Sequence, residues 1–357
     1  MMILHSADWH MDTPFAGRSQ EDSEYLRREL LKVPAQIADI CRSRLCDLVL
    51  LSGDLFDGAY TRESYLAVYH ALERMAVPVF VSPGNHDYCS PDSPWIRERW
   101  PENVHIFTQQ RIVSVAVPEL DCRIYGAGYQ SMDCPGLLEG FRAEDGEKYH
   151  IGLLHTDPVQ QTASPYCPVT PGQVRESGLH YLAAGHIHKA GSFRAGDTLC
   201  AWPGCPMGRG YDETGVKGIF LVNLQEIADV EWIPLDVPQF LDLEAEAGDA
   251  PLEAVKAVLP PVANNNFYRV TLTGYASEVD LKTISSELGD FVHLELRDKT
   301  LPETDLWSIA DEDSLEGTYF RMLRSAMEGQ DGDTCRRIRL AAQISRQILD
   351  GQEVRLP

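Results

Sequence analysis

The sequence predicts an α/β protein, chiefly because short apolar segments alternate with helical ones in its first third. Three segments rich in β-branched residues and leucine are each followed by polar residues or glycine, at residues 2–4, 47–51 and 79–81. Between them, 23–44 is helical with an interruption at Pro34, and 61–76 is helical with Thr61 as the expected N-cap. This alternation indicates parallel strands joined by crossovers, and ligands of such sheets gather at the carboxyl ends of the strands.

The rest of the chain is expected to form a β-rich second half followed by two smaller parts. Further strand-like runs lie at 104–107, 111–117, 122–126, 150–154, 180–184, 198–201 and 217–224. After Pro234 the pattern changes to a β-α-β-α-β unit between 240 and 297, and from about 303 the chain reads as helical. We therefore expect domains at 1–237, 238–300 and 301–357.

Composition narrows the function classes. The 357 residues carry a formal net charge of −23, which disfavours non-specific binding to polyphosphates because such binding relies on Lys and Arg. The nine cysteines form no C-x-x-C pair, so neither a zinc knuckle nor a disulfide framework is expected. No basic-then-apolar segment precedes Ile3 and no apolar run approaches the length of a membrane span, so we expect a cytoplasmic chain without membrane contact.

Polar side chains follow the predicted strands closely. They occur in the motifs "ADWH", "LSGD", "GNHD", "GLLH" and "AGHIHK", as Asp8, His10, Asp54, Asn85, His86, Asp87, His155, His186 and His188. Because each lies at the carboxyl end of a strand, all can converge on one rim of the sheet. Carboxylate, imidazole and amide ligands without thiolate suit Mn²⁺, Fe²⁺, Zn²⁺ or Mg²⁺. Seven ligands are too many for one tetrahedral ion and fit two ions that share a carboxylate.

Each motif has an ordinary structural explanation when taken alone. A Gly-Asp pair at a strand end is commonly a turn, and a single histidine such as His155 is more often a core residue than a ligand. A purely structural explanation must account for all five motifs, in this order and each at a strand end. The set therefore favours a metal site.

This ordered set resembles the signature of the calcineurin-like metallophosphoesterases over residues 2–235. The segments "HSADWHMDTPF", "LSGDLFD", "VSPGNHD" and "WPGCPMGRGYDETGVKG" are similar to those of the SbcD-type DNA repair exonucleases. The resemblance implies an αββα sandwich, with a small α+β capping domain after residue 238 and a helical C-terminal tail.

The resemblance also implies a role for each residue. Asp8, His10 and His188 would hold a first metal, Asn85, His155 and His186 a second, and Asp54 would bridge them. The ions, Mn²⁺ by preference, would hold a bridging hydroxide that attacks the phosphate. His86 would not bind metal but would donate to a phosphate oxygen, with Asp87 orienting its imidazole. Lys189 and Arg209 are candidate phosphate contacts, although ordinary surface charge explains them equally well.

Two departures from the pattern leave other functions open. His155 is followed by Thr156 and Asp157, unlike in many relatives, and the chain is very acidic for a protein that grips DNA. The expected activity is a 3′→5′ DNA exonuclease, with endonuclease action open, working in DNA repair with an SbcC-type coiled-coil ATPase and as a homodimer. The alternatives are a phosphodiesterase or phosphatase for small molecules or cyclic nucleotides, favoured by the acidity, and a non-catalytic scaffold, disfavoured by the intact ligand set.

Overall fold

The structure is a computed structural model that describes residues 1–144, 146–159, 164–276, 278–351 and 354. It divides into two compact units, Met1–Phe240 and Leu241–Pro357. Within the described ranges, no helix is long and apolar enough to span a membrane.

The first sheet of unit 1 contains the three strands expected at the N-terminus. Its order is β12-β11-β1-β2-β3-β4, and its strands are β1 (Met2–Ser6), β2 (Leu48–Leu51), β3 (Val79–Val81), β4 (Val104–Ile106), β11 (Gly218–Leu224) and β12 (Ala228–Pro234). β1 to β4 pair in parallel, whereas β11 pairs antiparallel with β1 and β12. The predicted parallel arrangement of the first three strands is confirmed.

The second sheet of unit 1 also has six strands. Its order is β5-β6-β7-β8-β10-β9, and its strands are β5 (Val113–Val117), β6 (Cys122–Gly126), β7 (Tyr149–His155), β8 (Tyr181–Gly185), β9 (Gly191–Ala195) and β10 (Thr198–Trp202). β6, β7, β8 and β10 are parallel neighbours, and β5 and β9 are antiparallel edges.

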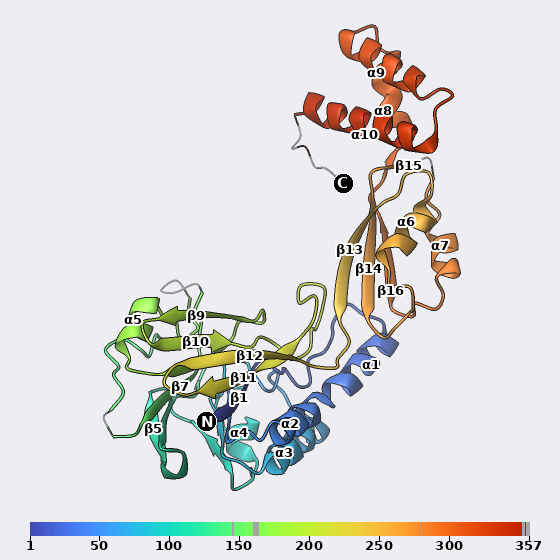
Figure 1. Cartoon of the computed structure of the whole chain (residues 1–357). Helices are drawn as coiled ribbons and strands as arrows, with labels where there is room; N and C mark the ends of the chain where they lie inside the picture. The colour runs from blue at the N-terminus through green and yellow to red at the C-terminus, as the bar shows by residue number, and fades with distance from the viewer. Residues whose placement is uncertain (145, 160–163, 277, 352–353, 355–357) are drawn as a thin grey trace. The chain divides into compact units, whose positions relative to one another are not determined.

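The core of unit 1 lies between the two sheets. Buried side chains from both meet there, among them Ile3, Leu50, Phe80, Ile124, Ile151 and Tyr181. The helices are α1 (Gln20–Leu30), α2 (Val33–Ser43), α3 (Arg62–Met75), the short α4 (Pro94–Arg97) and α5 (Pro171–Glu176), with a 3₁₀ turn at Pro118–Leu120. α2 and α3 lie beside the first sheet (Figure 1), and α5 packs on the second through Val174. This is the expected αββα sandwich.

Unit 2 begins with the expected β-α-β-α-β segment. Its sheet has the order β13-β14-β16, and its elements are β13 (Phe240–Glu246), α6 (Pro251–Val258), β14 (Phe267–Thr273), α7 (Leu281–Glu287) and β16 (Leu294–Asp298). Both helices pack on the sheet through an apolar cluster that includes Val255, Val270 and Ile284 (Figure 1). A two-stranded pair, β15 (Tyr275–Ala276) and β17 (Leu301–Pro302), follows.

The C-terminal part of unit 2 is helical, as expected. It contains α8 (Glu303–Ser308), a 3₁₀ turn at Ile309–Asp311, α9 (Leu315–Ala326) and α10 (Gly332–Leu349). Phe320 and Ala342 are buried, whereas Leu315 and Met322 on α9 are 85% and 69% exposed. Part of the apolar surface of α9 therefore points to solvent. Whether 238–300 and 301–357 act as separate domains stays a prediction.

Candidate metal centre

The polar motifs of unit 1 meet where the parallel strands of the two sheets end. Asp8 and His10 follow β1, Asp54 follows β2, and Asn85 and His86 follow β3. From the second sheet, His155 ends β7, and His186 and His188 follow β8. The two sheets are linked at this edge, since Ser52 Oγ donates a hydrogen bond to the Ala184 carbonyl at 2.8 Å.

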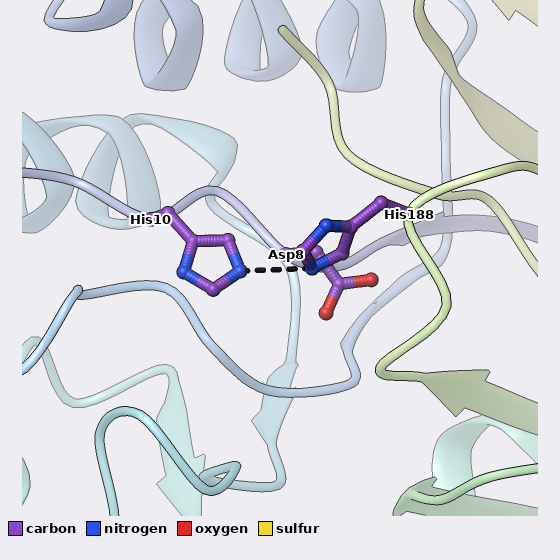
Figure 2. Close-up of side chains that lie close together, drawn as sticks. All are labelled: Asp8, His10 and His188. Carbon is purple, nitrogen blue, oxygen red and sulfur yellow. Dashed lines mark hydrogen bonds between the residues drawn. The ribbon is translucent and has the colours of Figure 1, made fainter. Parts of the chain in front are cut away.

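Asp8, His10 and His188 form one donor group (Figure 2). One ligand atom from each lies within 4.8 Å of the other two, and the Nε2 atoms of the two histidines are 3.2 Å apart. The His186 backbone N–H donates to Asp8 Oδ1 at 3.0 Å, whereas the buried Oδ2 has no hydrogen-bond partner among the described residues. A buried carboxylate oxygen left in this state is costly, and a cation would satisfy it.

Asp54 lies between this group and a second one. Its Oδ1 accepts the His86 backbone N–H at 2.8 Å, and its Oδ2 is 3.8 Å from His10 Nε2 and 3.4 Å from His155 Nε2. His155 Nε2 is also 3.0 Å from Asn85 Oδ1. One carboxylate oxygen thus faces donors on both sides, which is the position that a shared ligand requires.

The imidazoles of His155 and His188 are each held by a hydrogen bond at Nδ1, the ring nitrogen that faces away from the other candidate metal ligands. His155 Nδ1 donates to the Ser52 carbonyl at 2.8 Å, which leaves Nε2 to face Asp54 and Asn85. His188 Nδ1 lies 2.7 Å from Glu213 Oε1, so its Nε2 faces His10. Hydrogen bonds of this kind set the tautomer and orientation of metal-binding histidines.

Asp57, not Asp87, holds the imidazole of His86. Asp57 Oδ1 lies 2.7 Å from His86 Nδ1, and this hydrogen bond is the main reason why the pKa of His86 is raised. The Asp87 carboxylate is buried and accepts backbone N–H bonds from Leu55 at 2.8 Å and Gly84 at 2.7 Å. The expected role of Asp87 as the partner of His86 is therefore wrong: those bonds commit Asp87 to joining the two loops.

Four residues of the site have a backbone conformation that is rare outside glycine. Asp8, His10, Asp54 and His186 all have positive φ, at 54°, 47°, 52° and 86°. Such values are uncommon outside glycine and cluster at functional sites. The loops also approach closely, because a Cβ on Gly84 would lie 2.2 Å from Asp54 Oδ1. The glycine of "GNHD" thus makes room for the central carboxylate.

The electrostatics of the cluster favour positive charge. Burial by itself lowers the pKa of His155, but the carboxylates of Asp54 and Asp8 raise it to about 9. Burial raises the pKa of Asp54, yet the neighbouring histidines bring it below its usual range. Carboxylate, imidazole and amide donors with an unsatisfied buried oxygen fit divalent ions, and the donor groups suffice for two.

The remaining sequence-predicted residues lie at the margin. The His186 ring lies against Tyr166, with centroids 4.5 Å apart, and 5.3 Å from the His155 ring; its pKa falls to about 4, mainly through burial. Arg209 pairs with Glu213 at 2.7 Å. Lys189 is exposed.

Sequence reasoning missed Asp57 and Glu213. Asp57 stands three residues after Asp54, inside the quoted "LSGDLFD", and Glu213 lies inside "GYDETG". Both motifs stand out in the sequence, but single carboxylates in loops look like surface charge. Only the fold shows that each one meets an imidazole.

The chain is similar in sequence to one protein family and to several known proteins. The family described as calcineurin-like phosphoesterase matches residues 1–190, more than half of the chain. The uncharacterized metallophosphoesterase YhaO of Bacillus subtilis (strain 168) is 29% identical over 350 residues, covering 88% of this chain and 82% of that protein. The SbcD component of the nuclease SbcCD from the same organism is 24% identical over 276 residues, covering 65% and 68%. A solved structure, TT1561 of Thermus thermophilus, aligns with TM-score 0.40 and 13% identity over 65% of this chain and 98% of that one.

Proposed function

The chain belongs to the calcineurin-like phosphoesterase family, and on that premise we propose that it is a DNA exonuclease that uses two divalent metal ions. The observation that carries the chemistry is the position of Asp54 Oδ2 between the donors of His10 and His155. The observation that favours DNA is the similarity to the SbcD component of the nuclease SbcCD, which covers 65% of this chain.

The metal assignment keeps the ligand set that the family resemblance implies. Asp8, His10 and His188 would hold one ion, Asn85 and His155 together with His186 the other, and Asp54 both. The ions would supply Lewis-acid charge to the phosphate and lower the pKa of a water nucleophile. Mn²⁺ is our first choice for both positions.

The chain's own residues then complete the reaction. Because Asp57 occupies Nδ1 of His86, the proton on Nε2 is free to pass to the oxygen that leaves phosphorus. The water would lose one proton to bulk solvent and form the new P–O bond, the bond to the leaving oxygen would break, and His86 would supply the proton that this oxygen takes. Arg209, tied to Glu213, steadies His188, and the exposed Lys189 contacts a flanking phosphate.

The partners belong to the same proposal. The exposed apolar residues of α9 and α10, including Leu315, Met322 and Ile348, would dock on a coiled-coil ATPase of the SbcC type. Such a partner would also bring the positive charge that a chain of −23 lacks for holding DNA. Self-association as a homodimer is expected in addition.

A cleavage assay on end-labelled duplex DNA in Mn²⁺ tests the proposal. Wild type and His86→Ala are compared, with and without a coiled-coil ATPase encoded alongside. We expect stepwise shortening from a 3′ end, lost in the variant. Intact DNA beside brisk turnover of bis-p-nitrophenyl phosphate would instead assign the chain to small phosphodiesters, the function that its acidity favours.

A further inference from the structure

A pocket beside His86 is lined by residues other than the proposed metal ligands. It measures about 400 Å³, within the usual range of small-ligand sites, and its lining includes Tyr60, His86, Tyr88, Ser90, Ser93 and Arg97. It is formed by the loops that follow β2 and β3, the same two loops that present Asp54 and Asn85.

His86 connects the pocket to the chemistry. Its Nδ1 is taken by Asp57, while its side chain is 39% exposed and lines the pocket. The oxygen that receives the proton from His86 is bonded to the leaving group. A leaving group protonated by His86 would therefore lie beside this pocket.

The walls suit a nucleoside. Tyr60 and Tyr88 offer aromatic surfaces, and the Tyr60 hydroxyl is held by Glu98 Oε1 at 2.8 Å. Ser93 is 6% exposed, and its Oγ has no hydrogen-bond partner in the described part of the chain. An unpaired buried hydroxyl is costly, and rotation of this side chain towards the pocket would let a bound polar edge satisfy it. Arg97 is exposed at the rim, and its ion pair with Asp92 spans 3.9 Å, which leaves it able to meet a further phosphate.

We propose that this pocket is a subsite for the leaving nucleoside, with its base against Tyr88 and hydrogen-bonded by Ser93. This inference rests on the proposed function. It adds that the enzyme contacts the nucleoside on the leaving side of the scissile bond. Stacking on aromatic side chains tolerates any base, so the subsite would detect a base without choosing a sequence.

The test compares thymidylyl-thymidine with two analogues that each lack one base, using the full chain in Mn²⁺. Removal of the leaving-side base should lower kcat/KM by about fivefold to a hundredfold, the range that one stacked base contributes. Removal of the other base should have a smaller effect. In Tyr88→Ala and in Ser93→Ala, the ratio of kcat/KM for the dinucleotide to kcat/KM for the analogue without the leaving-side base should fall towards one. Ser93→Ala removes no internal hydrogen bond of the described residues, so its fold should hold even if Tyr88→Ala is unstable.

Tyr69→Ala is the matched control. Tyr69 is a half-buried tyrosine of α3 outside the pocket, and its replacement should leave the discrimination at the wild-type value. Equal cleavage of all three dinucleotides by wild type would overturn the subsite and leave the proposed function standing. Turnover of bis-p-nitrophenyl phosphate with no dinucleotide cleaved would overturn both the subsite and the nuclease activity.

Discussion

Two carboxylates that are not among the proposed metal ligands each hold an imidazole of the candidate site. Asp57 holds His86, and Glu213 holds His188, each through Nδ1 at 2.7 Å. Both act through a histidine, so their effects should depend on whether that histidine is present.

Asp57→Asn keeps the shape of the side chain and removes its charge. We expect kcat to fall by part of the about 10²–10⁴-fold that a general acid contributes, because His86 loses the group that raises its pKa. The double variant with His86→Ala should be no slower than His86→Ala alone, since residues that act as a unit are not additive. The measurement is steady-state kcat of the two single variants and the double variant. If the two losses in kcat multiplied in the double variant, Asp57 would act independently of His86.

Glu213→Gln should weaken metal binding by about 10–100-fold, as loss of an outer partner of a metal-binding histidine commonly does. The measurement is a Mn²⁺ titration of the metal-free protein, with Glu226→Gln, at an exposed glutamate, as the control. An unchanged affinity for both ions would mean that Glu213 only secures Arg209.

At the residue scale the sequence identified the donors better than their supports. Asp8, His10, Asp54 and His188 were predicted because carboxylate and imidazole recur at strand ends, and the fold brings them together. Asp57 and Glu213 were missed because a supporting carboxylate has no pattern of its own. Asp87 was misread for a related reason: adjacency to His86 in sequence suggested contact, but the turn sends the two side chains to different partners.

At the scale of elements, the site depends on loops that approach one another without intervening side chains. Gly84→Ala should displace the central carboxylate, because the new Cβ would lie 2.2 Å from Asp54 Oδ1. We expect a folded protein with reduced metal content and activity, measured by metal analysis and circular dichroism. Gly172→Ala, where the nearest atom is 3.8 Å from the added Cβ, is the control. A Gly84→Ala protein with full metal content would show that the loop adapts.

Apolar runs predicted most strands of the two large sheets, including the edge strands β4 and β5, but two other edge strands have no such run. Thr61 caps α3 with a capping box, as the sequence indicated. β9 and β12 were missed because they lie at sheet edges and carry polar residues on one face, such as Arg194 and Glu231. The helical character of α9 was predicted, but the exposure of Leu315 and Met322 followed only from the structure.

On the scale of the whole molecule, metal binding should be coupled to folding. Ions that bind only the folded state at a hundredfold excess over Kd add about 2.7 kcal/mol each to the free energy of unfolding. Mn²⁺ should therefore raise the melting temperature measured by calorimetry, and a chelator should reverse the shift. A melting temperature that stays the same after addition of Mn²⁺ and of the chelator would argue against metal binding by the folded chain.

The αββα sandwich, and the meeting of the motifs at one edge of it, could be predicted because alternating strands and helices leave few possible topologies. The substrate could not, since net charge and family resemblance point in different directions. The net charge of −23 is a sum over the whole chain, whereas the candidate site occupies one edge of unit 1. The net charge therefore does not report the charge around the site.

The central claim is that five strand ends assemble one centre for two metal ions around Asp54. Manganese bound per chain, measured by elemental analysis on wild type, His86→Ala and Asp54→Ala, tests it most directly. We predict two ions in wild type and in His86→Ala, with turnover lost in the latter, and depleted binding in Asp54→Ala. An Asp54→Ala protein that keeps both ions and its normal rate would contradict the account.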